Sequence, residues 1–282
     1  MISAQGSMTG RQNPAMGWLL HPRIPENPPW TLWPAMALLA FVLRVGVALS
    51  GDFVIHPDEI MQYLEPAHKE VFGNGVTYWE YFFGARQWLV PGLVAAVLSL
   101  LNTIGLGTPQ YYIGAVEIFF CGISLSIPIG MYFFARLHFS EASARLALVV
   151  GSVWYELVGF AHKPMTEFVS TGLVMILLAL CIRPNPGQSQ TVWAVALVGT
   201  LAAAVRFQYT PVVGIIMGIF FLRTRKKLQL VLISAGFVLA IGVFDGFSWG
   251  RGLFHSYLTN FKFNIAVSAG LADQSPPWQY LV

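Results

Sequence analysis

The chain has 282 residues, of which 56% are hydrophobic and only 10% are charged. Soluble domains carry about 25% charged residues, so a chain this poor in charge is predicted to be a polytopic membrane protein rather than a water-soluble one. The formal net charge of +3 is too small to indicate nucleic-acid binding. The two cysteines, Cys121 and Cys181, lie inside apolar runs, which favours core positions over a disulfide.

The N-terminal segment 1–32 is polar and rich in proline. The first long apolar run begins only at Trp33, which is too late for a secretory signal peptide. The segment is therefore predicted to be a cytoplasmic polar extension that leads into a retained membrane helix.

Eight apolar runs are candidates for membrane helices, since about 20 mostly apolar residues span a bilayer. They cover 33–50, 88–105, 111–135, 144–160, 165–182, 191–205, 209–222 and 229–246. Arg206-Phe207-Gln208 interrupts one long apolar stretch, which predicts a broken or partly inserted pair of helices there.

Basic residues in short loops mark the cytoplasmic side of a membrane protein. They are Arg223, Arg225, Lys226 and Lys227 as a cluster, with Arg136, Arg145 and Arg183 earlier in the chain. This pattern places two loops outside, 51–86 and 247–282. An odd number of crossings must then separate residue 86 from Arg136, although two apolar runs lie between them, so one of those runs is expected not to cross.

The outer loop 51–86 concentrates acidic residues. It holds six of the thirteen in the chain, namely Asp52, Asp58, Glu59, Glu65, Glu70 and Glu80. The helical spacing of Asp58, Gln62, Glu65 and Lys69 predicts one polar face of an amphipathic helix that begins near Pro57. The other face would carry Met61, Leu64 and Val71, so the helix is expected to rest on the membrane surface beneath a row of carboxylates.

Three interpretations of these acids are open from the residues alone. The first is a solvated loop without chemistry. The second is a metal site, because Glu65-x-x-His68 has the spacing of di-iron ligands and His56 and Asp58 lie nearby, although the sequence has no second Glu-x-x-His. The third is a general base, since a carboxylate at this position can accept the proton of an incoming hydroxyl.

Two ordered blocks of sequence carry a resemblance to a known family. The first comprises His56-Pro57-Asp58-Glu59, Gln62, Glu65, His68, Thr77-Tyr78-Trp79-Glu80, Arg86 and Pro91. The second comprises Asp245-Gly-Phe-Ser-Trp-Gly250, Asn260-Phe-Lys-Phe-Asn264 and Pro277-Trp278-Gln-Tyr280. Together they resemble the outer loops of glycosyltransferase family 22, the mannosyltransferases of the Alg9 and PIG-B type that act in dolichol-linked oligosaccharide and GPI-anchor assembly.

The resemblance implies an all-α, GT-C-like transmembrane bundle over 33–282, with amphipathic helices in the first outer loop. Loop 51–86 would be catalytic and 247–282 would form a second outer loop. Family members continue through further helices, so a chain that ends at Val282 is expected to be a fragment or a reduced version. The active loops would face the periplasm of a bacterium or the lumen of the endoplasmic reticulum.

The resemblance also implies the chemistry. An inverting transferase would move mannose, or a related hexose, from a polyprenyl-phosphate sugar to a hydroxyl of a lipid-linked glycan, without a metal or other cofactor and without nucleic acid as a partner. Asp58 is the implied general base, with Glu59 second.

Further roles follow from the same resemblance. The donor phosphate would meet Arg206, Arg86, Lys163 or Arg251. The acceptor or sugar would meet His56, Gln62, Glu65, Trp79, Glu80 and Trp278. Asp245 is expected to orient the second outer loop.

Charged residues inside the predicted membrane segments leave other functions open. Arg206 lies in an apolar run, where arginine is costly and usually functional, unless it snorkels to the interface. Arg44 is mid-helix and is expected to pair with Glu117 or Glu156. Such intramembrane charges also suit a transporter, and the short chain suits an inactive glycan-binding remnant.

Overall fold

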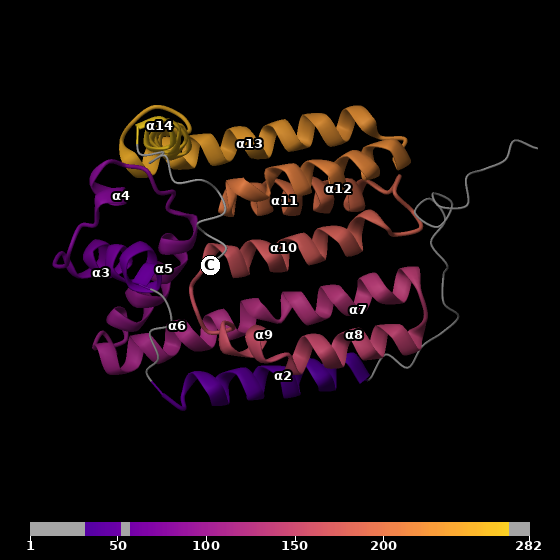
Figure 1. The fold of residues 1–282 in the computed structure, drawn as a ribbon, viewed down its shortest axis with the longest axis horizontal. Helices are drawn as coiled ribbons and strands as arrows, with labels where there is room; N and C mark the ends of the chain where they lie inside the picture. The colour runs from indigo at the N-terminus through magenta and orange to yellow at the C-terminus, as the bar shows by residue number, and fades with distance from the viewer. Residues whose placement is uncertain (1–31, 52–56, 271–282) are drawn as a thin grey trace, which may run out of the picture.

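A computed structural model describes residues 32–51 and 57–270, in which the regular elements are helices and no strand occurs (Figure 1). The helices are α2 (Leu32–Ala48), η1 (Glu59–Leu64), α3 (Glu65–Phe72), α4 (Trp79–Phe82), α5 (Leu89–Thr103), α6 (Pro109–Ser124), α7 (Ser126–His138), α8 (Glu141–Val153), α9 (Tyr155–Gly159), α10 (Thr166–Cys181), α11 (Ser189–Val205), η2 (Phe207–Tyr209), α12 (Thr210–Arg223), α13 (Lys227–Trp249) and α14 (His255–Gly270). The predicted all-α class is confirmed for this part of the chain.

The long helices lie along one axis, whereas α3, α4, α5 and α14 gather at one end of the bundle (Figure 1). Within the described residues, Pro109–His138 and Lys227–Trp249 are long and apolar enough to cross a membrane, and five further apolar helical segments are shorter. Helix α10 packs against α7, α11 and α12, and thus occupies the centre of the bundle.

The position of α5 bears on the crossing count expected between residue 86 and Arg136. The apolar run 88–105 forms α5, which packs on η1, α3 and α6 at the end of the bundle (Figure 1). The run 111–135 forms α6 and α7, which together make a single passage along the axis. Of the two runs, only 111–135 lies in a helical stretch long and apolar enough to cross a membrane, whereas α5 packs beneath η1 and α3 (residues 59–72), which together form the acidic helix. The expectation that one of the two runs does not cross stays a prediction.

Small residues let the central helices approach closely. A Cβ added at Gly130 of α7 would lie 2.7 Å from the Cβ of Met175, and one at Gly172 of α10 would lie 2.0 Å from Ser126 Oγ. Neither contact leaves room for a methyl group, so α7 and α10 pack at a distance that needs glycine on each of them.

The expectation for Arg44 is wrong. Its side chain is fully buried in α2 and donates hydrogen bonds to three backbone carbonyls, those of Ala40 (3.1 Å), Gly151 (3.0 Å) and Ser152 (2.9 Å). The last carbonyls of a helix lack partners inside it, and here they belong to α8. Arg44 therefore satisfies the C-terminal end of α8 instead of an acid.

The predicted break after α11 is confirmed. Helix α11 ends at Val205, η2 follows, and α12 returns beside α11 in the opposite direction. The α7–α8, α10–α11 and α12–α13 loops, which carry the basic residues, share one end of the bundle, while Arg206 and the acidic helix share the other (Figure 1).

Candidate active site

The acidic helix differs from its predicted form because its first part, Glu59–Leu64, is a π-helix. A π-turn closes from residue i to i+5, so the α-helical spacing used in the prediction does not hold here. Glu59 and Gln62 are turned inward and buried, whereas Met61, expected on the apolar face, is 40% exposed. The predicted polar face is therefore wrong at Gln62, whereas its two carboxylates, Asp58 and Glu65, are half-buried.

Glu59 forms a buried ion pair with Lys163, with 2.9 Å between Lys163 Nζ and Glu59 Oε1. The lysine and glutamate side chains are only 3% and 6% exposed. Glu59, predicted to be catalytic, is thus paired with Lys163, a residue predicted to bind the donor phosphate. His162 lies next to this pair in the chain, and burial, with the charge of Lys163, lowers its pKa to about 4, so the imidazole is neutral at pH 7.

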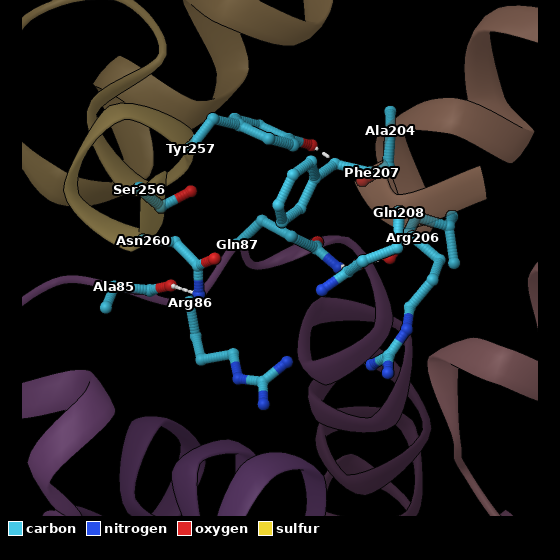
Figure 2. Close-up of a pocket in the computed structure, with 11 residues that line it drawn as sticks. Ala85, Arg86, Gln87, Ala204, Arg206, Phe207, Gln208, Ser256, Tyr257 and Asn260 are labelled. Carbon is cyan, nitrogen blue, oxygen red and sulfur yellow. Dashed lines mark hydrogen bonds between the residues drawn. The ribbon is translucent and has the colours of Figure 1, made fainter. Parts of the chain in front are cut away.

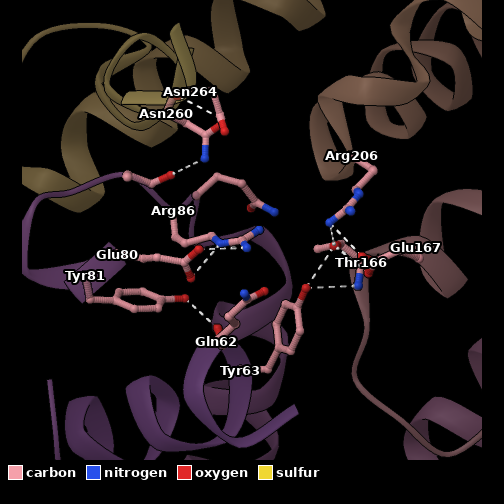
Figure 3. Close-up of polar contacts among 12 residues, drawn as sticks. Gln62, Tyr63, Glu80, Tyr81, Arg86, Thr166, Glu167, Arg206, Asn260 and Asn264 are labelled. Carbon is pink, nitrogen blue, oxygen red and sulfur yellow. Dashed lines mark hydrogen bonds and ion pairs between the residues drawn. The ribbon is translucent and has the colours of Figure 1, made fainter. Parts of the chain in front are cut away.

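Arg86 and Glu80 form a forked ion pair, shown in Figure 3. Arg86 Nε and Nη2 each donate to one oxygen of Glu80 over 2.9 Å. Burial alone would lower the pKa of Arg86, but the hydrogen bonds and charge of Glu80 outweigh burial and raise that pKa above its ordinary value. The resemblance implies an acceptor-binding role for Glu80, and its carboxylate here orients the guanidinium.

Arg206 lies at the end of α11 and joins three elements (Figure 3). It forms an ion pair with Glu167 of α10 over 2.7 Å and donates to Thr166 Oγ1 over 3.4 Å. The Tyr63 hydroxyl shares a hydrogen bond of 2.8 Å with the same Thr166 oxygen. Arg206 is therefore tied through Thr166 to the π-helix that follows Asp58.

The two arginines line one small cavity, which we call the arginine cavity, at the same end of the bundle as the acidic helix (Figure 2). Its volume is about 40 Å³, enough for a group the size of a few water molecules and too small for a glycolipid. Arg86 and Arg206 are the charged residues in its described lining, and Figure 2 shows their guanidinium groups on the same side. Lys163 and Arg251 do not line it, and Arg251 is exposed on the α13–α14 turn.

Helix α14 holds both walls of the arginine cavity. Asn260 Nδ2 donates to the Ala85 carbonyl over 3.1 Å, and the Tyr257 hydroxyl donates to the Ala204 carbonyl over 2.9 Å. Buried Asp245 accepts from the Ser256 backbone N–H over 2.8 Å, at the start of α14. Asp245 thus fixes the start of α14, which in turn holds the arginine-bearing segments. Its predicted role in orienting the segment 247–282 stays a prediction.

A glycine in the α4–α5 loop allows close contact with the start of α14. Gly84 has φ +70°, and a Cβ there would lie 2.6 Å from His255 Nε2. A side chain would be strained and would also clash, so this position requires glycine. Two residues later, the Arg86 carbonyl accepts a hydrogen bond of 3.0 Å from Trp249 Nε1.

The other predicted ligands are spread around the site. Glu65 Oε1 accepts from the Val76 N–H over 2.6 Å, and His68 Nδ1 lies 3.1 Å from the Asn74 carbonyl oxygen, so both residues order the α3–α4 loop. Trp79 stacks one ring face on Phe263 at 4.7 Å.

Two of the residues predicted to bind the acceptor or sugar cannot be placed. Two residues that link Arg206 to the π-helix are not among those that the sequence predicts. His56 and Trp278 lie outside the described residues. Among the residues that are described, no three His, Cys, Asp or Glu side chains gather in a group suited to a metal ion. Tyr63 and Thr166 are central to the network, but a tyrosine or threonine beside an apolar stretch has no distinctive pattern.

Comparison with known proteins decides the family. The model of the Alg9-like mannosyltransferase family matches residues 35–273. The chain belongs to this family. The predicted membership of an Alg9-like and PIG-B-like family of membrane mannosyltransferases is confirmed.

Individual relatives of this Alg9-like chain are distant. GPI alpha-1,2-mannosyltransferase 3 of Danio rerio is 27% identical over 243 residues, which are 83% of this chain and 44% of the relative. GPI mannosyltransferase 3 of Drosophila melanogaster is 25% identical over 254 residues, 86% of this chain and 43% of the relative. A mannosyltransferase of Arabidopsis thaliana is 41% identical over 78 residues, 28% of this chain and 14% of the relative. The chain spans slightly less than half the length of the Danio rerio and Drosophila melanogaster relatives. No solved structure matches it.

Proposed function

We propose that this protein transfers mannose, or a related hexose, from a polyprenyl-phosphate sugar to a hydroxyl of a lipid-linked glycan, with inversion at the anomeric carbon. The observation that carries the proposal is the arginine cavity, which two arginines from distant segments line at the end of the bundle that bears the acidic helix. The names of the relatives, which are GPI mannosyltransferases, support the sugar and the class of acceptor.

The arginine cavity suits a lipid phosphate. Guanidinium groups bind phosphate oxygens with paired hydrogen bonds, and they neutralise the charge that develops as the phosphate leaves. Arg86 is held in place by Glu80, and Arg206 by Glu167 and Thr166, so their orientation is fixed before the donor binds. We place the donor phosphate between these two residues, and assign Lys163 to Glu59 instead.

Asp58 is the proposed general base. It immediately precedes the π-helix, which the Tyr63 hydroxyl joins through Thr166 to Arg206. The acceptor oxygen attacks the anomeric carbon and gives its proton to Asp58. The bond from that carbon to the phosphate oxygen breaks, and the polyprenyl phosphate leaves with the electron pair toward the arginines.

The membrane orientation follows from charge. The end with Arg136, Arg145, Arg183 and the cluster at 223–227 would face the cytosol, because retained basic loops do so. The acidic helix and the arginine cavity would then lie at the opposite interface, lumenal or periplasmic. A prenyl tail in the lipid and a glycan in the water can meet at that interface.

The proposal is tested with purified protein in lipid nanodiscs and a polyprenyl-phosphate [³H]mannose donor. Wild type should transfer label to a lipid-linked glycan, and Asp58→Asn should slow transfer by about 10²- to 10⁴-fold, the usual contribution of a general base. Glu156→Gln, which changes an exposed acid on α9 outside the arginine cavity, should transfer at the wild-type rate. Equal rates in Asp58→Asn and wild type would refute the role of Asp58, and donor flux across vesicles without a labelled product would favour a transporter.

A further inference from the structure

A second and larger cavity is lined in part by Tyr81, whose hydroxyl bonds to the π-helix. We call it the aromatic cavity. It has a volume of about 310 Å³ and is lined by α3, the α3–α4 loop, the start of α5 and the end of α13. Small-molecule sites begin at about 300 Å³, so this one has room for a single compact ligand. None of the roles predicted from the sequence uses its aromatic residues.

Three aromatic rings form one wall of the aromatic cavity. The centroids of Tyr81 and Trp88 are 5.4 Å apart, those of Tyr81 and Trp249 are 6.1 Å apart, and those of Trp88 and Trp249 are 6.4 Å apart. The Tyr81 hydroxyl donates to the Gln62 carbonyl over 2.6 Å, and Trp249 Nε1 donates to the Arg86 carbonyl. Their polar atoms are thus engaged with the backbone, and what these two residues can offer a ligand is chiefly ring surface.

The opposite rim is polar and carries both signs of charge. Lys69, Glu70 and Thr77 are exposed there, and Lys69 Nζ donates to Thr77 Oγ1. A hydrocarbon chain would strip water from these groups without replacing their hydrogen bonds, which is costly. A neutral sugar fits both sides, because its hydroxyls can bond to the rim while its C–H face lies on the negative faces of the rings.

The aromatic cavity adjoins the proposed donor site through one residue. Arg86 lines the arginine cavity, and its carbonyl accepts a hydrogen bond from Trp249, which lines the aromatic cavity. We propose that the aromatic cavity binds a hexose of the acceptor glycan while a neighbouring sugar is extended. This inference rests on the proposed function, and it assigns acceptor recognition to Trp88, Trp249, Lys69 and Thr77.

Saturation-transfer NMR with methyl α-mannoside tests the inference without the need for turnover. At about 10 mM probe, a ligand with a millimolar Kd occupies most of its sites. Wild type in nanodiscs should transfer saturation to the ring C–H protons, and Trp88→Leu should weaken binding by about tenfold, the loss expected for one aromatic stacking contact. Trp193→Leu is the matched control, since Trp193 is 52% exposed on α11, outside the cavity.

Thr77→Trp is the second variant, because it adds bulk at an exposed position of the lining and leaves the three aromatic side chains intact. It should weaken mannoside binding, while the labelled-donor assay on Asp58→Asn tests the proposed function separately. Absence of any mannoside signal overturns the inference. A mannoside signal that survives Trp88→Leu and Thr77→Trp but is lost in Arg206→Gln also overturns it, because the sugar would then bind in the arginine cavity. Citronellyl phosphate serves as a second probe, a short prenyl phosphate. If Trp88→Leu abolishes its signal but not the mannoside signal, the inference is overturned as well.

Discussion

The buried Glu59–Lys163 pair leads to a quantitative prediction about stability. An ion pair whose side chains are 3% and 6% exposed loses several kcal/mol when one partner is removed, because the remaining charge has no water to replace it. Lys163→Met should therefore destabilise the protein by about 3–5 kcal/mol. For a chain of this size, such a loss corresponds to a fall of about 6–20 °C in the midpoint of thermal unfolding.

The chain offers both an assay and a matched control. Cys121 and Cys181 are buried free thiols, so a thiol-reactive fluorogenic dye reports unfolding in detergent. Arg145→Met removes a surface partner of Glu141, in an i,i+4 pair with the arginine 45% exposed, and should cost at most about 0.5 kcal/mol. The double variant Glu59→Gln/Lys163→Met should recover part of the loss, because it removes both charges of the pair. Equal midpoints for Lys163→Met and Arg145→Met would refute a buried pair and would return Lys163 to the phosphate ligands.

Three further predictions concern the same end and the core of the bundle. Tyr81→Phe removes the hydrogen bond to the Gln62 carbonyl and should cost about 1 kcal/mol in the free energy of unfolding, measured by the same dye assay, whereas Tyr155→Phe, on an exposed ring, should leave the midpoint unchanged. His162 has a pKa of about 4 in the folded protein against 6.5 when unfolded, so the unfolded state binds the proton more readily. The free energy of unfolding should therefore fall by up to about 3 kcal/mol as the pH is lowered from 6.5 to 4. His162→Gln should show a smaller fall, and an equal fall would contradict the burial of this ring. Arg44→Met leaves carbonyls at the end of α8 without their donor and should cost more than about 2 kcal/mol, and a wild-type midpoint would argue against this cap.

Composition and charge are sufficient to predict the coarse architecture. The scarcity of ionised groups predicts a helical membrane protein, and the basic loops predict which segments share an end of the bundle. The break at Arg206 is also predictable, because arginine seldom sits in an apolar run without a reason. These features depend on local sequence, and local sequence is what a pattern can reveal.

The details of the site depend on contacts between distant segments. The periodicity expected for the acidic helix is wrong because a π-helix has no clear sequence signature, and its inward turn takes Glu59 to Lys163, 104 residues away. The partner expected for Arg44 is wrong because the carbonyls of α8 carry no side-chain signal. Trp88 and Trp249 have no role in the sequence prediction for the same reason, since only the folded chain brings their rings together.

Equilibrium binding of the donor tests the central claim most directly, namely that Arg86 and Arg206 hold its phosphate. The measurement uses a short-chain prenyl-phosphate mannose and isothermal titration calorimetry, in an Asp58→Asn background that binds without turnover. Arg206→Gln should weaken binding by about 10- to 150-fold, the loss expected for a charge-assisted hydrogen bond, and Arg251→Gln, an exposed arginine at the same end outside the arginine cavity, should bind as tightly as the parent. Unchanged affinity in Arg206→Gln together with a large loss in Arg251→Gln would contradict the account and would move the donor phosphate to the α13–α14 turn.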